Sequence, residues 1–532
     1  MRSNLNIVVN RDTCTVCGIC VETCIMDNLR MHLSPCRNAC PLHVNAQGYV
    51  RLIAEGKAED AARLLREDLP FAGIIGRICS RPCEEQCERI KVDGEAVHIL
   101  ALKRYLADGM PEIMNAPSPI DPPSGKRVSI VGSGPAGMMA AHDLATHGHS
   151  VTLFDAASEP GGMLRWGIPE FRLSREVVSQ SIHMLEAMGI VFKTGYGVGG
   201  EIEVDQLERE WDAVLLAMGA GTAVRLNVPG EDLENVYRGI DFLEMVRKGH
   251  RPSVGTSVMV IGGGNTAVDV ALTCRKLGAQ DVSIICLEDI KDMPAFEWEI
   301  AEAIEEGITV RDCWGLKKIY RDNGQLAAEL SQCLSIFDDH GCFAPQLANE
   351  CGLEPSVDTI IVAIGQESTL SGIPDDLMDG DKTAIAADAT TFQTCREKIF
   401  VAGDITGGTQ SVVHAMAQGR EAALSINRLL EGERLGWGRT YWDGTCITDF
   451  PVDTAGAVSR KRSPLPRIPI AQRTLVDEVE QTMDGKEARL QAERCLNCGY
   501  PAEMNQTCWS CLPCEIECPV DALEVRMPYH IR

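Results

Sequence analysis

The clearest pattern along the chain is a short apolar run that gives way to glycines and then to an apolar helical stretch. Residues 128–131 read Val-Ser-Ile-Val, typical of a buried strand, and residues 138–147 follow with helical character. A second apolar run at 150–154 ends in Asp155. This order predicts a β-turn-α-β unit of an α/β fold with a parallel sheet.

The same pattern occurs a second time, and a further strand and a long helix follow it. Residues 257–261 predict a strand that leads into three glycines and a helix, and 282–287 predict the next strand. Far downstream, 398–404 predict a strand ending in Gly-Asp, and 411–431 predict a helix. We therefore predict two Rossmann-like dinucleotide-binding domains, of which the first is interrupted by the second. This order resembles that of flavoproteins with two such domains, in which the FAD domain is interrupted by the NAD domain and resumes at a Gly-Asp, and it implies the same assignment here.

Glycines at the two strand–helix turns carry the candidate chemistry of both units. They permit a tight turn and a close approach to a pyrophosphate at the helix N-terminus, while an acid after the next strand binds ribose hydroxyls. The first unit supplies Gly132, Gly134, Gly137 and Asp155, and the second supplies Gly262, Gly263, Gly264, Asn265 and Thr266. Because each fingerprint lies between a strand and a helix, we expect two bound dinucleotides.

Twenty-three cysteines are the second strong pattern, and the N- and C-terminal segments hold most of them. Two runs have the C-x2-C-x2-C-x3-C spacing of bacterial ferredoxins, in which the fourth sulfur often binds a second cluster: Cys14, Cys17, Cys20, Cys24 and Cys508, Cys511, Cys514, Cys518. The remaining candidate ligands are Cys36, Cys40, Cys79, Cys83, Cys87, Cys495 and Cys498. We expect about three 4Fe-4S clusters, with structural zinc as the alternative for part of the C-terminal group.

Length and charge place the chain among multidomain globular proteins. It has 532 residues, of which 45% are hydrophobic, and a formal net charge of -26, which argues against a nucleic-acid partner. No apolar run approaches the roughly 18 to 20 residues that span a bilayer. Residues 1–13 also lack the pattern of a signal peptide, so we expect a cytoplasmic protein without membrane insertion.

Composition shifts along the chain suggest its domain boundaries. Prolines cluster at 117–125 and 460–470, and the second cluster predicts a semi-rigid spacer that docks against a partner subunit. We expect a ferredoxin-like segment at 1–34, a helical iron-sulfur domain at 35–116, an FAD domain at 126–250 and 371–432, an NAD domain at 251–370, a linker at 433–486 and an iron-sulfur module at 487–532.

Residues 35–430 resemble the small subunit of glutamate synthase and its relatives, among them the N-terminal half of dihydropyrimidine dehydrogenase and NADH-dependent ferredoxin:NADP oxidoreductase. The motifs that carry the resemblance lie at 76–87, 160–172, 227–232, 262–266, 292–295 and 403–404. Besides the first fingerprint, the resemblance implies FAD contacts at Gly162, Arg172, Gly403, Asp404 and Val413. It places the nicotinamide cofactor against residues 262–266 and Gly365.

One departure from the family concerns the choice of nicotinamide cofactor. Members that use NADPH carry an Arg-Arg pair just after the second strand of the NAD domain, where this chain has Leu287 and Glu288. A carboxylate there would repel a 2'-phosphate and accept hydrogen bonds from a free 2'-hydroxyl, which predicts NADH. The alternative is that Glu288 faces solvent and that Lys291 or Arg275 binds the phosphate of NADPH.

Further departures concern the cysteines. The family's opening C-x2-C pair is absent before Cys36, and the carboxamide or carboxylate ligand of some members is replaced near Lys103 by a side chain that cannot serve. Cys24 is the candidate for that ligand position. Residues 487–498 read like the family's cluster-leading helix, but at the far end of the chain, and two of the last six cysteines are left for zinc, a second cluster or neither.

These observations predict an electron-transfer subunit that takes a hydride from NADH at FAD, or delivers one to NAD. Single electrons would pass through 4Fe-4S clusters to a larger redox subunit, a ferredoxin or a bifurcating complex in an anaerobic metabolism. Hydride transfer needs no acid or base from the protein, so we assign no catalytic residue. The alternatives are an NADPH-dependent donor of the glutamate synthase type, and a cluster relay with a vestigial nicotinamide site.

Overall fold

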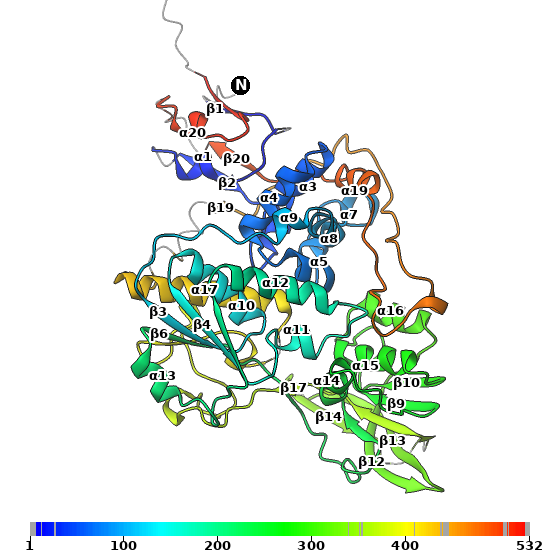
Figure 1. The fold of residues 1–532 in the computed structure, drawn as a ribbon. Coiled ribbons are helices and arrows are strands. Elements are labelled where there is room, and N and C mark those ends of the chain that lie inside the picture. Colours follow the sequence, from blue (N-terminus) through cyan, green and yellow to red (C-terminus); the bar gives the residue numbers. More distant parts are fainter. Residues whose placement is uncertain are drawn as a thin grey trace, which may run out of the picture.

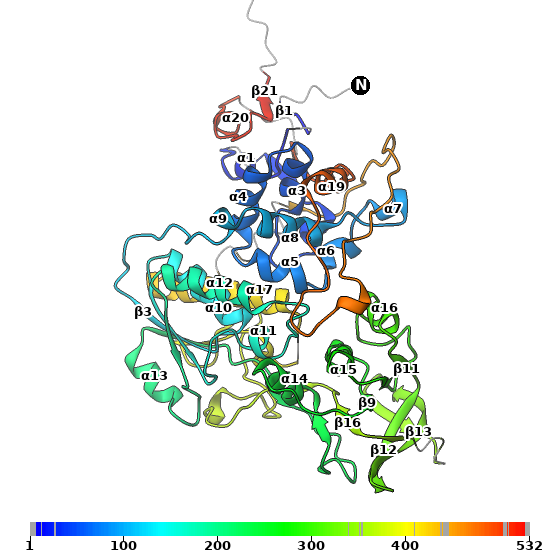
Figure 2. The same cartoon turned by 45° about the vertical axis from the view of Figure 1, so that its right-hand side comes forward.

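The computed structural model describes residues 7–11, 13–25, 28–338, 340–349, 352, 355–408, 410–436, 439, 446–503, 508 and 510–526. Figures 1 and 2 show a module made from the N- and C-terminal segments, a helical domain below it, and two α/β domains side by side at the base. No helix in the described part of the chain combines the length and the apolar character needed to cross a membrane.

The FAD-type domain is built on a five-stranded parallel sheet. Its strand order is β18 (Ile399–Val401), β6 (Ala213–Leu216), β3 (Arg127–Val131), β4 (Ser150–Asp155) and β5 (Val191–Thr194). The inner strands β3 and β6, and β18 beside them, are near-continuous buried runs because helices cover the sheet, whereas the edge strand β5 is partly exposed. The helices of this domain are α10 (Pro135–Thr146), α11 (Met163–Trp166), α12 (Arg175–Ala187), α13 (Val204–Glu210) and α17 (Val412–Glu431). Helix α17 lies directly on α10, where Gly419 allows the two backbones to touch.

The NAD-type domain is inserted between β6 and β18 and repeats the design. Its parallel sheet has the order β11 (Thr309–Arg311), β10 (Asp281–Ile285), β9 (Ser257–Ile261), β16 (Thr359–Val362) and β8 (Val236–Arg238). Its helices are α14 (Gly239–Arg247), α15 (Asn265–Lys276) and α16 (Glu297–Glu305). An antiparallel extension of β12 (Trp314–Asp322), β13 (Gln325–Phe337), β14 (Phe343–Leu347) and β15 (Ser356–Val357) follows, and β7 (Thr222–Ala223) pairs with β17 (Gln366–Glu367) where the chain crosses between the domains.

The helical domain packs above the FAD-type sheet through α5 (Ala72–Ile78), which touches α12 and α17. Its other helices are α2 (Pro35–Asn38), α3 (Ala46–Ala54), α4 (Ala58–Asp68), α6 (Pro82–Glu85), α7 (Ile90–Asp93), α8 (Ile99–Gly109) and α9 (Pro111–Met114). Helix α19 (Gly485–Ala492), from the far end of the chain, completes it by packing on α3 and α8.

The N- and C-terminal segments, expected as separate units, fold together. Strand β1 (Ile7–Val9) pairs antiparallel with β21 (Leu523–Val525), and β2 (Leu29–His32) lies between β19 (Cys446–Ile447) and β20 (Tyr500–Glu503). Helices α1 (Ile19–Glu22) and α20 (Pro513–Ile516) contact each other over this core. We call this unit the terminal module.

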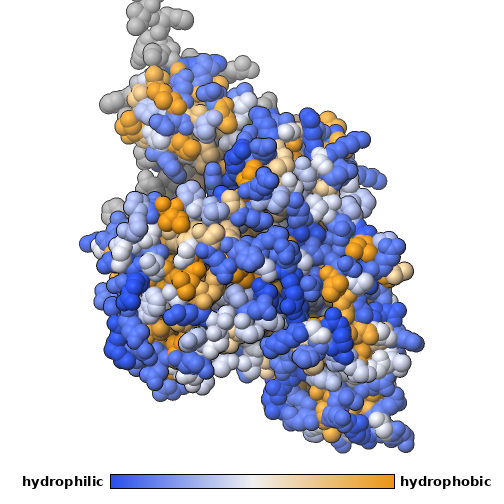
Figure 3. Space-filling view, in the orientation of Figure 1, coloured by the Kyte–Doolittle hydropathy of each residue, from blue (hydrophilic) through white to orange (hydrophobic). Residues whose placement is uncertain are grey.

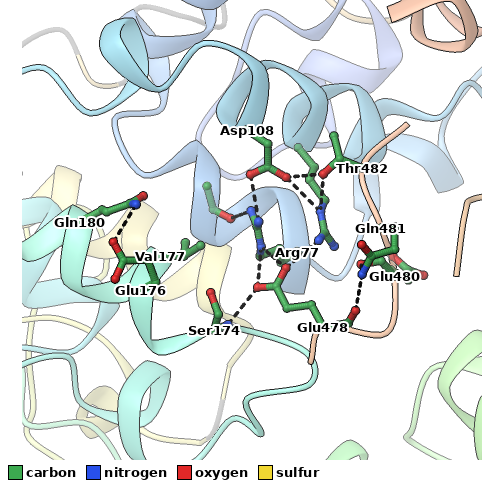
Figure 4. Close-up of polar contacts among 12 residues, drawn as sticks. Arg77, Asp108, Ser174, Glu176, Val177, Gln180, Glu478, Glu480, Gln481 and Thr482 are labelled. Carbon is green, nitrogen blue, oxygen red and sulfur yellow. Dashed lines mark hydrogen bonds and ion pairs between the residues drawn. The ribbon is translucent and has the colours of Figure 1, made fainter. Parts of the chain in front are cut away.

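The expected spacer is a strap that holds three domains together. Residues 460–484 run along the helical domain and both α/β domains, and Arg467 and Arg473 pair with carboxylates of α16. Val479 donates a backbone hydrogen bond to Phe171 of the FAD-type domain at 2.9 Å. Glu478 pairs with Arg77 of the helical domain (Figure 4) and also with Arg104. The spacer prediction is therefore wrong, because charged contacts bind this segment along its length.

Candidate functional site

A cavity of about 600 Å³ lies at the carboxyl ends of the FAD-type strands. This is the edge where open α/β sheets bind nucleotides, and the volume is in the range of cofactor pockets. Six of the predicted FAD contacts line it, namely Gly132, Gly134, Asp155, Gly162, Gly403 and Asp404. Ser133, Val412 and Gln410 also line it; sequence analysis missed them, although Ser133 lies inside the first fingerprint and Val412 opens α17.

The first glycine turn fits a dinucleotide because side chains are excluded from it. Gly132 has a φ of 107°, and a Cβ there would lie 2.1 Å from the Ala217 carbonyl oxygen. Nothing lies within 4 Å of the corresponding position on Gly134, so the space in front of it is open. Gly137 has another role, since a Cβ there would strike the Gly132 carbonyl oxygen at 1.9 Å. Gly137 lets α10 approach the turn and does not line the cavity.

Two carboxylates line this cavity. Asp155 ends β4 and accepts hydrogen bonds from the backbone N–H of Ser133 at 2.8 Å and from the Ser133 hydroxyl. Asp404 follows β18 and accepts from the Gln410 N–H at 2.9 Å, while burial raises the pKa of Asp404. Val413, by contrast, is 1% exposed and packs in the core, so its side chain is not a contact; Val412 lines the cavity instead.

Arg172 was predicted to contact FAD, and the structure places it elsewhere. Its guanidinium lies 2.9 Å from Asp269 of α15 and also pairs with Glu299 of α16. Burial, with the neighbouring charge of Asp269, raises the pKa of Glu299 to about 7 against the pull of Arg172. Arg172 therefore joins the FAD-type and NAD-type domains, because two buried carboxylates of the second domain attract it.

The second glycine turn brings most of the predicted nicotinamide-binding residues together. Gly262 has a φ of 135° and packs against Ala363, two residues before Gly365, while Asn265 opens α15 and accepts a hydrogen bond from the Phe296 N–H at 2.8 Å. Thr266 follows Asn265 in the first turn of α15. Nothing lies within 4 Å of a Cβ built on Gly264, so this turn also opens to space where a pyrophosphate could lie.

Glu288 reaches over this turn. A Cβ on Gly263 would lie 2.7 Å from Glu288 Oε2, so the carboxylate is beside the glycine turn instead of facing away from it. Arg275 lies at the other end of α15, where it donates to the carbonyl oxygens of Ala279 at 3.0 Å and Gln280 at 2.7 Å. Lys291 is 3.4 Å from the carboxylate of Asp289. Arg275 therefore points away from the glycine turn, whereas Lys291, 76% exposed, has only this surface ion pair among the described residues.

The terminal module contains two groups of four cysteines. Each group has three cysteines from one terminal run and a fourth cysteine from the other run. Cys14, Cys17 and Cys20 form the first group, and Cys518, from the C-terminal run, lies close enough for its charge to raise the pKa of the Cys14 and Cys20 thiols. Cys508, Cys511 and Cys514 surround a small cavity with Cys24, from the N-terminal run. The prediction that Cys24 replaces the missing ligand near Lys103 is therefore wrong, because the pairing of β1 with β21 places Cys24 in the terminal module.

The helical domain holds the other seven cysteines. Cys36 and Cys87 line one cavity with Cys495 and Cys498, which follow α19. This C-x2-C pair occupies the place of the one that is absent before Cys36. Cys40, Cys79 and Cys83 form a fourth group, buried with Lys103 of α8. The fifteen candidate ligands thus form four groups, one more than the expected number of clusters.

The cysteine sulfurs of the described residues are not spaced for a single zinc ion. Sulfurs around one zinc ion lie about 3.8 Å apart, given tetrahedral Zn–S bonds of about 2.3 Å. Within the described ranges, no three cysteine sulfurs lie within 4.8 Å of one another. Backbone N–H groups also donate to the sulfurs of Cys14, Cys24 and Cys518 at 3.2 to 3.4 Å, as is common around iron-sulfur clusters. Burial raises the pKa of the Cys20 and Cys495 thiols to about 12, so iron would displace protons there.

Two families match the chain in the regions that the geometry defines. Residues 126–419 match the pyridine nucleotide-disulphide oxidoreductase family, and residues 29–114 match the 4Fe-4S domain II of dihydropyrimidine dehydrogenase. The fold and the sites thus define a flavin and iron-sulfur oxidoreductase. The chain belongs to the pyridine nucleotide-disulphide oxidoreductase family and is an NAD(P)H-dependent enzyme with FAD and 4Fe-4S clusters.

Relatives with known roles extend beyond this region. The chain is 32% identical over 506 residues to the NADP(+)-dependent formate dehydrogenase subunit beta of Moorella thermoacetica, which covers 87% of this chain and 70% of that protein. It is 31% identical to the NAD-dependent dihydropyrimidine dehydrogenase subunit PreT of Escherichia coli, over 76% of this chain and 93% of that one. The structure of FprA from Mycobacterium tuberculosis superposes with a TM-score of 0.51 at 18% identity, over 62% of this chain and 88% of that one, which supports the fold alone.

Proposed function

We propose that this protein takes a hydride from NADH at its flavin and passes single electrons to a partner protein. The observation that carries the proposal is the terminal module, in which both ends of the sequence build two four-cysteine groups, above a helical domain with a third. When bound, FAD accepts hydride and the clusters carry single electrons. We assign the clusters to Cys14, Cys17, Cys20 and Cys518; to Cys24, Cys508, Cys511 and Cys514; and to Cys36, Cys87, Cys495 and Cys498.

The protein's own groups would hold and orient both nucleotides. The turn at Gly132 exposes backbone N–H groups to a pyrophosphate at the start of α10, and Asp155 stands where ribose hydroxyls would lie. The turn at Gly262 repeats this geometry at α15. Arg172 would hold the two domains in register, which sets the distance over which hydride passes.

The preference for NADH rests on Glu288. Its carboxylate beside Gly263 would accept hydrogen bonds from a free ribose 2'-hydroxyl and would repel a 2'-phosphate. Relatives differ in this respect: the formate dehydrogenase subunit is named as NADP(+)-dependent and the PreT subunit as NAD-dependent. The charge of Glu288 is thus the observation that supports NADH for this chain.

A partner protein is supported by the surface of the terminal module, where apolar side chains gather in Figure 3. Ile25, which follows Cys24, is 72% exposed, and Ile516, between Cys514 and Cys518, is 73% exposed. Exposed apolar groups beside a cluster favour docking of a redox partner that must approach closely. The formate dehydrogenase and dihydropyrimidine dehydrogenase relatives are also named as subunits.

Anaerobic stopped-flow spectroscopy with NADH and NADPH in parallel, on protein of known iron content, tests the proposal. We expect NADH to bleach the flavin faster than NADPH, and the cluster absorbance to fall afterwards. Faster bleaching by NADPH would overturn the cofactor assignment. Absence of bleaching by either would favour a cluster relay with an unused nicotinamide site.

A further inference from the structure

The fourth cysteine group differs from the other three in its composition. Cys40, Cys79 and Cys83 are 6%, 5% and 4% exposed. The charged side chains that share their surroundings are Lys103, which is 2% exposed, and Glu84, which is 5% exposed. Three thiolates can bind three irons of a cube, but an ammonium group offers three donors and no lone pair for a fourth. A four-iron cluster with a complete ligand set therefore does not fit this group.

Other side chains near this group are already engaged. Glu84 accepts hydrogen bonds on both carboxylate oxygens, from the Leu100 N–H at 2.8 Å and from Arg462 at 2.6 Å. The Tyr49 hydroxyl donates to the Ile99 carbonyl oxygen at 3.2 Å. His98 contacts the Ser463 carbonyl oxygen at 2.7 Å and the Arg462 guanidinium. Cys24 belongs to the terminal module, and Cys87 belongs to the Cys36 group.

We propose that Cys40, Cys79 and Cys83 hold a three-iron cluster and that Lys103 stands where a fourth iron and its ligand would be. A three-iron cluster is a cube without one corner, and the sulfides around that corner accept hydrogen bonds. The three N–H donors of a buried ammonium complement them and offset the negative charge of the thiolates. The three-iron cluster concerns this cysteine group alone and is independent of the nicotinamide preference and of the partner protein.

The test uses the full chain, purified without oxygen, with iron counted and EPR spectra recorded after mild oxidation. We expect the near-isotropic signal of an oxidised three-iron cluster in the unaltered protein. We expect it to persist after incubation with ferrous iron and a thiol reductant. A cluster that had merely lost an iron would take one up and lose the signal, which would overturn the proposal, as would absence of the signal from the start.

Two substitutions at one position separate a ligand effect from a structural effect. Lys103→Gln supplies a carboxamide, the ligand type that some relatives use, and we expect the three-iron signal to disappear while the iron content rises by one atom per chain. Lys103→Met removes the charge without supplying a ligand, and we expect the three-iron signal to remain. Equal behaviour of the two variants would contradict the role of Lys103, and the spectra of the unaltered protein decide the cluster type even where a variant fails to fold.

Discussion

Glu478 is the centre of the polar network that ties the strap to the helical domain, and replacing it tests how that network works. Its carboxylate accepts hydrogen bonds from Arg77 at 2.8 Å and from the Ser174 N–H at 2.9 Å (Figure 4). It also accepts one from Arg104 at 2.6 Å. Glu478→Gln keeps the shape of the side chain and removes its charge. The substitution therefore leaves the positive charges of two buried guanidinium groups with one negative partner fewer.

The expected magnitude follows from burial and from the partners that remain. The side chains of Arg77 and Arg104 are 7% and 8% exposed, and that of Glu478 is 12% exposed, so solvent screens these charges little. Removing one partner of a buried ion pair costs about 3–5 kcal/mol. Asp108 still faces both arginines at 2.9 and 3.3 Å, which lowers the expected cost to about 2–3 kcal/mol. The open population of the strap should then rise roughly 30- to 140-fold.

Hydrogen exchange of the strap measures this opening directly. The Val479 N–H donates to the Phe171 carbonyl oxygen of the FAD-type domain, so its protection reports whether the strap is closed. Glu480→Gln is the matched control, because Glu480 lies 3.8 Å from Arg81, is 31% exposed and should cost less than about 1 kcal/mol. Equal protection in the two variants would refute the reasoning, since it would mean that the charge of Glu478 does not hold the strap.

Three further predictions concern the cofactor sites and the domain junction. Glu288→Gln should shift the ratio of kcat/KM for NADH over NADPH towards NADPH by about 5- to 30-fold, as expected for about 1–2 kcal/mol of lost repulsion. An unchanged ratio would show that the carboxylate does not contact the ribose. Cys498→Ala should lower iron content by up to one cluster and leave flavin bleaching by NADH intact, whereas Cys342→Ala, at an exposed cysteine, should change neither. Because the folded-state pKa of Glu299 is raised to about 7 from its ordinary 4.5, its ionisation destabilises the fold progressively as pH rises between these values. Glu299→Gln should therefore raise the free energy of unfolding by up to about 1–3 kcal/mol above pH 7, with a smaller gain near pH 5; a difference that is constant with pH would contradict the assignment.

Local patterns predicted the elements of the α/β domains well. The strand expected at 257–261 is Ser257–Ile261, and the helix expected at 411–431 is Val412–Glu431. These segments are apolar runs or long periodic stretches whose burial follows from the sheet itself. The strand expected at 282–287 is Asp281–Ile285, shifted by one or two residues at its ends. Six of the nine expected FAD contacts line the cavity, since glycine turns and strand ends are local features.

Residues whose partners lie far away in sequence could not be placed in this way. Cys24 and Cys508 belong to one group although 484 positions separate them, and the spacing within each run does not show which fourth cysteine is exchanged. Arg172 was assigned from a motif, while its contacts with Asp269 and Glu299 depend on how two domains meet. The grouping of Cys24 with Cys508 could have been expected, because the fourth cysteine of a ferredoxin run often binds the other cluster.

The strap brings the C-x2-C pair of the third cluster site back to the helical domain. A C-x2-C pair after a helix must reach Cys36 and Cys87, and here that helix is α19, so the chain has to return from the α/β domains to the helical domain. Arg494, beside this pair, is fully buried and donates to the carbonyl oxygens of Ala96 and Arg460, which fixes the pair in place. The segment beyond α19 then supplies β20 and Cys518 to the terminal module. The charged contacts along the strap therefore help to position ligands for three cluster sites, namely the Cys36 group and the two groups of the terminal module. Loosening the strap should therefore affect cluster content before it affects flavin binding, since the flavin cavity is lined entirely by residues between 132 and 415.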